Sequence, residues 1–155
     1  MSSLGLIRRV AIAACGAFSL LAAVACQNAV GQSASPIRNI EVDVAPLRAS
    51  AGEPTASWVQ RGLPGQLSQA LAGHMASQGG TLVVRIDYVT LGANKDGWAQ
   101  DNISGVATIG GAQRPVRAIT RYQASAVDQV MFEESNRRRV TQLMQALAYW
   151  IAREI

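Results

Sequence analysis

Two arginines that flank an isoleucine have the clearest binding chemistry in this sequence. Arg117 and Arg121 alternate with Ile119 in the segment 115–122, PVRAITRY, and Arg114 directly precedes it. In a β-strand, residues two apart point to the same face, so residues 117, 119 and 121 share one face. A guanidinium group binds phosphate or carboxylate through parallel hydrogen bonds. This face therefore suits an anionic ligand, and a solvated face whose charges protect a sheet edge is the alternative interpretation.

Two tryptophans are further candidates for contact with a partner. Trp58 and Trp98 both lie in segments predicted to be loops. An exposed tryptophan in a loop can anchor a protein partner or a membrane surface, and a tryptophan that folds back over the core is the alternative. The triplet at 137–139, three consecutive arginines, would spread around a helix at 100° per residue and so forms no single basic face.

Catalytic chemistry is not expected from these residues. His74 is the only histidine, so a second imidazole for a metal site is missing, and we expect a satisfied histidine near the core boundary. No Gly-x-Ser-x-Gly motif is present for nucleophilic catalysis. The carboxylate pairs at 41/43 and 133/134 fit a solvated strand face and a helix start. The sequence predicts a protein that is not an enzyme, without catalytic residues, metal or cofactor.

Four segments have the alternating pattern of half-buried strands. They are residues 37–44, 81–91, 102–109 and 115–122. In the second, alternation places Leu82, Val84, Ile86 and Tyr88 on one face. Gly110-Gly111 predicts a tight connection between the last two strands.

Two segments have helical periodicity. Residues 63–78 repeat apolar positions at 63, 67, 70 and 71, with His74 on the same face, and Gly79-Gly80 is expected to end that helix. The C-terminal stretch is amphipathic, and its apolar face is predicted to contain Val140, Leu143, Met144, Leu147, Ala148, Trp150, Ile151 and Ile155. Residues 46–62 contain Pro, Gly, Ser and Thr and are predicted to be a long loop.

The order of these elements is β-α-β-β-β-α. Two amphipathic helices and four half-apolar strands can all bury their apolar sides if both helices pack on one face of the sheet. We therefore expect an α+β fold with a four-stranded, mostly antiparallel sheet, built as a single domain over 37–155. The first two strands are separated by a helix, which permits a right-handed parallel crossover.

The charge and cysteine content limit the class of protein. The chain contains 14 Lys and Arg residues against 10 Asp and Glu, and two of the arginines lie in the leader described next. The remaining near balance argues against a nucleic-acid partner. Beyond residue 26 there is no cysteine, which excludes a disulfide framework and thiolate metal sites.

The first 25 residues have the pattern of an export signal. Arg8-Arg9 is followed by an uncharged run rich in Ala, Leu and Val, and Ala23-Val24-Ala25 supplies the small residues that a signal peptidase needs. Cys26 follows at once, in a context that resembles the lipobox of bacterial lipoproteins, where the cysteine receives the lipid. We predict a signal peptide at 1–25 and a lipidated N-terminus with a flexible tether at 26–36. Ordinary cleavage, which would release a soluble periplasmic protein, and a retained anchor remain alternatives.

The whole pattern resembles small Gram-negative envelope lipoproteins, in particular the lipopolysaccharide-assembly lipoprotein family. The resemblance spans roughly residues 20–155. It rests on Cys26, the first strand, the helix pattern Leu67-Ser68-x-Ala70-Leu71-x-x-x-Met75-x-x-x-Gly79, the strand PVRAITRY and the lead EESNRRR into the last helix. It implies a palmitate-bearing protein on the periplasmic face of the outer membrane, which supports lipopolysaccharide assembly.

The expected partners are therefore a membrane, through the N-terminal lipid, and an outer-membrane protein or anionic glycolipid, through the arginine-bearing face. An auxiliary lipoprotein subunit of an ABC-type lipid transport system is the alternative function.

Overall fold

One four-stranded sheet organises the part of the chain that the structure describes. The structure is a computed structural model and describes residues 36–93, 98–123 and 131–155, all within one compact unit, Ala34–Ile155. The predicted signal peptide, Cys26 and all of the predicted tether except Pro36 lie outside the described residues.

The strands follow the chain order across the sheet, β1-β2-β3-β4. β1 pairs parallel with β2, and both other pairings are antiparallel. The sheet is thus mixed and mostly antiparallel, which confirms the predicted α+β fold class. The strand bounds are Ile37–Asp43 for β1, Gly80–Thr90 for β2, Trp98–Ile109 for β3 and Ala112–Gln123 for β4.

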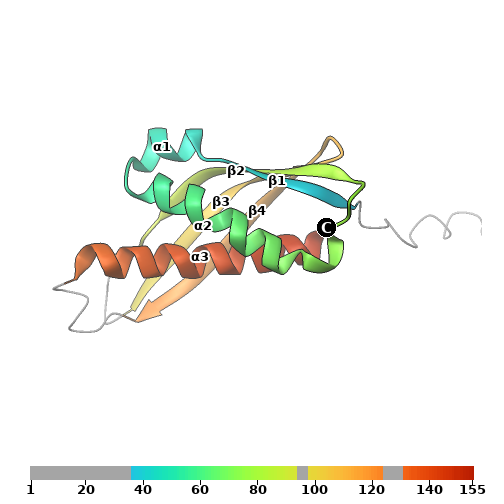
Figure 1. Cartoon of the computed structure of the whole chain (residues 1–155). Helices are drawn as coiled ribbons and strands as arrows, with labels where there is room; N and C mark the ends of the chain where they lie inside the picture. The colour runs from blue at the N-terminus through green and yellow to red at the C-terminus, as the bar shows by residue number, and fades with distance from the viewer. Residues whose placement is uncertain (1–35, 94–97, 124–130) are drawn as a thin grey trace, which may run out of the picture. The chain divides into compact units, whose positions relative to one another are not determined.

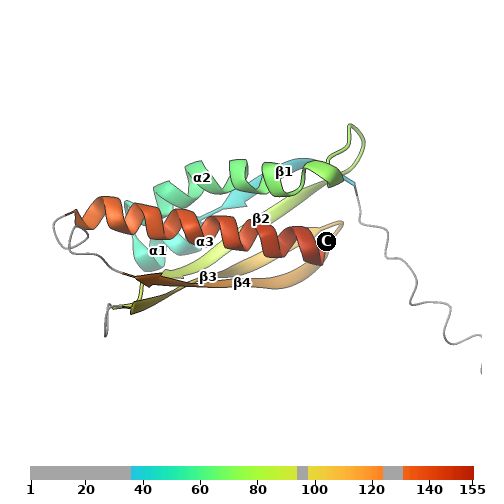
Figure 2. The ribbon, with the colours of Figure 1, turned by 90° about the horizontal axis from the view of Figure 1, so that it is seen from below.

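Two long helices cover one face of this sheet (Figures 1 and 2). They are α2, Thr55–Ala70, and α3, Phe132–Glu154. A short helix, α1, spans Ala45–Ala51 and packs beside β2 beyond the end of β1, where Ser50 Oγ donates a hydrogen bond of 3.2 Å to the carbonyl oxygen of Asp87. A 3₁₀ helix, η2, follows α2 at Ala72–His74.

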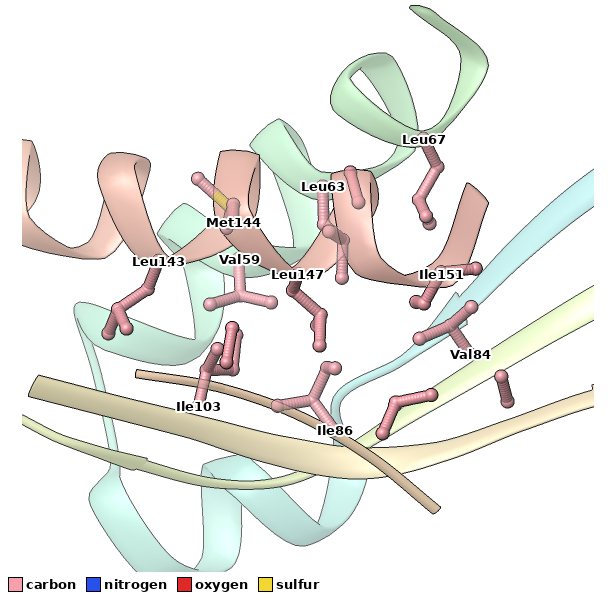
Figure 3. Close-up of a cluster of buried hydrophobic side chains, with 14 of the residues drawn as sticks. Val59, Leu63, Leu67, Val84, Ile86, Ile103, Leu143, Met144, Leu147 and Ile151 are labelled. Carbon is pink, nitrogen blue, oxygen red and sulfur yellow. The ribbon is translucent and has the colours of Figure 1, made fainter. Parts of the chain in front are cut away.

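The core lies between these two helices and the sheet, as Figure 3 shows. Burying each large aliphatic side chain contributes about 1.5–3 kcal/mol to stability. Gly62 lets the helices approach closely, since a Cβ added there would lie 2.6 Å from Met144 Cε. The side chains at the centre are no more than 1% exposed and are Val59, Leu63 and Leu67 from α2, Val84 and Ile86 from β2, Ile103 from β3, and Leu143, Leu147 and Ile151 from α3.

The prediction of a loop at 46–62 is wrong, because this segment forms α1 and the first half of α2. Pro46 stands in the first turn of α1, where a missing N–H costs nothing, and Pro54 directly precedes the first residue of α2. Ala56 and Val59 then begin the spacing of three and four residues that Leu63 and Leu67 continue on the buried side. The segment that we read as a loop from its Pro and Gly content therefore had a helical apolar face.

The first predicted helix also ends earlier than expected. α2 stops at Ala70, which is exposed, and the chain continues through η2 to the extended Met75. Gly79 does not cap the helix in a left-handed conformation. Glycine is needed at this position because the backbone of residue 79 lies close to the backbone of Pro36. A Cβ added at Gly79 would lie 2.3 Å from the carbonyl oxygen of Pro36.

The turn between β3 and β4 is as tight as predicted. Gly110 and Gly111 have φ values of 55° and 84°, and Ile109 pairs with Ala112 across them. A two-residue hairpin of this kind needs positive φ at both turn positions, which glycine adopts without steric cost.

The buried side of α3 matches the prediction except at Trp150. Val140, Leu143 and Leu147 are fully buried, whereas Trp150 is 46% exposed. At 100° per residue Trp150 lies at the margin of the apolar arc, where the sheet no longer covers it. Within the described ranges, no helix has both the length and the apolar character that crossing a bilayer requires.

Candidate binding face

The sheet face opposite α2 and α3 is uncovered by any described element, and we call it the open face. Alternate residues of β3 and β4 point to it, because their neighbours in sequence are buried under the helices. Arg117, Ile119 and Arg121 of β4 are all exposed on this face, and we call these three the arginine row. The prediction that they share one solvent-facing side of a strand is confirmed.

The arginine row is partly fixed by its neighbours on β3. Arg117 Nε donates a hydrogen bond of 2.8 Å to Asn102 Oδ1, and Asn102 is the cross-strand partner of Ile119. The side chain of Arg117 is thereby held along the sheet surface beside Ile119, which is 47% exposed. The Cα atoms of Arg117 and Arg121 are four residue steps apart along the strand, which is about 13 Å.

No carboxylate neutralises the arginine row within the described ranges. Arg117 contacts a neutral amide, and neither it nor Arg121 forms an ion pair with a described residue. The open-face residues of β3, which alternate from Trp98 to Thr108, include no acid. Two positive charges thus stand on this half of the sheet without a counter-charge from any residue that the structure describes.

On the other half of the open face, formed by β1 and β2, acidic side chains neutralise the exposed arginine. Arg85 on β2 donates a hydrogen bond of 2.8 Å from Nε to Asp87 Oδ1 and lies opposite Asp43 on β1. This hydrogen bond, and then the charges of Asp87 and Asp43, raise the pKa of Arg85 above its ordinary value. Glu41 is a second exposed acid on β1. An anionic ligand would therefore prefer the β3–β4 half.

A β-bulge brings Tyr88 onto the open face, contrary to the prediction that it shares the buried side of β2. Ile86 pairs with Gly105 and Tyr88 pairs with Ser104, so Asp87 is one residue too many for the ladder. The extra residue inverts the alternation. Tyr88 becomes 59% exposed, and Val89 packs against the core in its place.

Sequence reasoning missed Tyr88 although a signal was present. The apolar side chains that pack in or against the core along β2 and just after it are at 82, 84 and 86 and then at 89 and 91, so their parity changes where the bulge lies. Tyr88 and Arg117 both pair with Ser104, one from each side, which places them in one row across three strands. Strands lie about 4.8 Å apart, so the two Cα atoms are separated by about 10 Å.

Trp98 lies on the open face as well, in a strand and not in the predicted loop. It is the first residue of β3, opposite Gln123, and it is 52% exposed. Gln100, two residues along β3, pairs with Arg121, so Trp98 and Arg121 are diagonal neighbours. Diagonal neighbours lie about 7–8 Å apart, within reach of long side chains. The arginine row therefore has Tyr88 near one end and Trp98 near the other.

Two predicted contact residues do not belong to this site. Trp58 is in α2 and packs against the core, so its placement in a loop is wrong. Arg114 pairs with Ala107 and shares the parity of Val116 and Ala118, which places it on the helix side of β4.

Arg139, one of the predicted triplet, has a side chain that is only 12% exposed, and its role is structural. Its guanidinium Nε donates a hydrogen bond of 2.9 Å to Asp101 Oδ2, and its Nη2 contacts Asp101 Oδ1 and the carbonyl oxygen of Gly92. The Tyr122 ring centroid lies 5.1 Å from its Cζ atom. Asp101 is fully buried, and Gly92 N donates to it at 3.0 Å. This network ties α3 to β3, to β4 and to the segment after β2, and so supports the sheet beneath the arginine row.

The other candidate residues of the sequence analysis do not join the arginine row. His74 is half-buried in η2, far along the chain from any carboxylate pair. The described residues bring no three His, Cys, Asp or Glu side chains together at a place that could hold a metal ion. What the open face brings together is suited to binding: guanidinium groups, amide side chains, aliphatic side chains and two aromatic rings.

No protein-family model matches the chain, and a search of curated proteins finds no match. Among solved structures, the chain is similar to a minor lipoprotein from Acinetobacter baumannii, with 13% identity over 76% of this chain and 94% of that one. A second, an uncharacterized protein, has 20% identity over 77% of this chain and 89% of that one. The TM-score is 0.43 in both cases, below the level at which two chains share a whole fold.

Proposed function

We propose that this protein is an exported, lipid-anchored binding protein of the bacterial envelope, which holds a phosphorylated glycolipid against the arginine row and thereby supports lipopolysaccharide assembly. The observation that carries the proposal is the arginine row itself: two guanidinium groups with an apolar side chain between them, on a sheet face where no described residue pairs with their charge and no described element covers them.

The export part of the proposal comes from the leader. A short basic start, an apolar run and Ala23-Val24-Ala25 before Cys26 match the order of features that directs a chain through the inner membrane. A cysteine at the cleavage point supplies the sulfur that a lipid modification needs. The protein would then act at a bilayer surface on the outer side of the inner membrane.

The ligand part comes from the chemistry of the open face. Phosphate groups suit the planar fork of a guanidinium, and two such forks about 13 Å apart suit a ligand with more than one anionic group. Ile119 offers an apolar contact between them, and the rings of Tyr88 and Trp98 suit the apolar faces of sugars or the start of an acyl chain. A phosphorylated glycolipid combines these features in one molecule.

A charge-reversal experiment tests the proposal. The mature chain should be captured on immobilised lipopolysaccharide, and Arg117→Glu/Arg121→Glu should weaken capture at least about tenfold. The reason is that each charged hydrogen bond contributes about 1.5–3 kcal/mol, and 1.4 kcal/mol is a factor of ten. Circular dichroism checks that the variant is folded.

A matched control separates a specific site from general attraction. Arg38→Glu/Arg61→Glu makes the same change in net charge at two exposed arginines away from the arginine row. Capture should remain near the wild-type level in this variant. An equal loss in both double variants, or no loss in the first, contradicts the proposed site. Capture of an outer-membrane protein in place of the glycolipid would overturn the choice of ligand.

A further inference from the structure

Two exposed aromatic side chains lie side by side in the last turns of α3. Tyr149 and Trp150 are 57% and 46% exposed, and their ring centroids lie 6.1 Å apart in an edge-on arrangement. The Cζ atom of Arg153 lies 5.6 Å from the Tyr149 centroid and 5.5 Å from the Trp150 centroid. Its Nη1 also donates to Tyr149 Oη at 3.3 Å. One guanidinium thus organises two large rings on the protein surface.

A cluster of Tyr, Trp and Arg side chains is typical of the interface between a membrane and water. Tyr and Trp have an apolar body and a polar tip, and they concentrate where hydrocarbon meets water in membranes. Arginine can bury its aliphatic stem while its charge stays among the headgroups. Rings held on a helix end by cation–π contact are already ordered, so less rotamer entropy is lost when they enter such an interface.

The aromatic pair lies at the end of the domain from which the chain leaves toward Cys26. Both views place the last turns of α3 at the same end as the start of β1 (Figures 1 and 2). The segment after η2 is also there, since Met75 forms a parallel bridge with Ile37 and Ala76 N donates a hydrogen bond of 2.9 Å to Ile37 O. Met75 is 39% exposed. We call Met75, Tyr149, Trp150 and Arg153 the aromatic end.

Chain length limits how far this end can lie from an anchored lipid. Ten residue steps separate Cys26 from Pro36, and a fully extended chain covers at most about 3.3–3.6 Å per residue. Pro36 would therefore remain within about 35 Å of a lipidated Cys26. This step rests on the proposed function, because it takes Cys26 to be in the bilayer.

We infer that the aromatic end is a second membrane contact, which docks on the headgroup region of a phospholipid bilayer beside the lipid anchor. β4 begins at this end, at the hairpin, and the arginine row follows about 15–30 Å further along the strand. Docking would thus fix which end of the domain meets the membrane and leave the arginine row above the surface, open to a ligand or partner.

Vesicle flotation without the lipid anchor tests this inference directly. The chain from Cys26 onward, with Cys26→Ser, is mixed with vesicles of phosphatidylcholine and phosphatidylglycerol. The parent should float with the vesicles, and Tyr149→Ser/Trp150→Ser should reduce the bound fraction about tenfold, whereas Trp150→Phe should retain most of it. Phe132→Ser is the matched control, because Phe132 is 70% exposed at the opposite end of α3.

Each result decides the inference. A parent that stays with the soluble fraction overturns it, and so does an equal loss in the Phe132→Ser variant. Thermal unfolding checks that every variant is folded. Radiolabelled palmitate in cells tests the anchor separately: label in the wild type but not in Cys26→Ser supports lipidation. Failure of labelling with intact flotation removes the anchor and leaves the aromatic end as a contact.

Discussion

At the scale of single residues, burial decides what an arginine does. Arg117 and Arg139 have the same chemistry, yet Arg117 lies on an open surface beside a neutral amide while Arg139 is almost enclosed with a carboxylate. A charge removed from water must be paired and hydrogen-bonded, and Asp101 with Gly92 satisfies Arg139. The exposed arginines can be exchanged at little cost to folding, and the buried one cannot.

The Asp101–Arg139 pair gives a stability prediction. Asp101→Ala should lower the free energy of unfolding by about 3–5 kcal/mol, because it leaves the Arg139 charge buried without its partner. Glu134→Ala is the control, since it removes an exposed ion pair with Arg137 and should cost no more than about 1 kcal/mol. Urea denaturation monitored by circular dichroism measures both. Similar losses in the two variants would mean that Arg139 is not effectively buried.

At the scale of elements, the bulge in β2 forms the candidate face. It turns Tyr88 outward, and it depends on Gly105, the partner of Ile86. A Cβ added at Gly105 would lie 1.9 Å from the carbonyl oxygen of Arg85, so the two backbones approach as only glycine permits.

A pair of glycine substitutions tests this close approach. Gly105→Ala should destabilise the protein by about 3 kcal/mol or more, because the added methyl group meets backbone and not a movable side chain. Gly65→Ala is the matched change in α2, where a Cβ meets nothing within 4 Å, and it should stabilise by about 0.5–1 kcal/mol. Chemical denaturation compares them. A Gly105→Ala protein as stable as the wild type would contradict the described bulge.

Sequence periodicity predicted the elements whose apolar pattern is unbroken. The four strands, the hairpin at Gly110-Gly111 and the buried side of α3 follow from alternation or from 3.6-residue spacing. It failed where composition was weighed above spacing, as in the Pro- and Gly-containing segment that forms α1 and starts α2. It also failed where one inserted residue changed the parity, as at Asp87. The arginine row was predictable because a strand face needs only local alternation. Tyr88 could have been placed from the change of parity at Asp87, whereas the role of Arg139 depends on a contact with Asp101 that is distant in sequence.

At the scale of the whole molecule, the described domain separates its tasks by face and by end. α2 and α3 close one side of the sheet and provide the core, which leaves the other side open. The acids of β1 and β2 neutralise one half of that open face, and the arginine row occupies the other half. The aromatic end lies where the chain leaves toward Cys26. In our proposal the membrane contact and the ligand contact therefore do not compete for the same surface.

The most direct test of this account is photo-crosslinking in intact cells from position 119. A photoreactive amino acid replaces Ile119 in the full chain, and the matched control replaces Gln142, an exposed residue on the helix side of the domain. The account predicts an adduct at position 119 that contains a phosphorylated glycolipid, and no such adduct at position 142. Equal labelling at both positions, or adducts at position 119 that contain no glycolipid, would contradict the proposed ligand face.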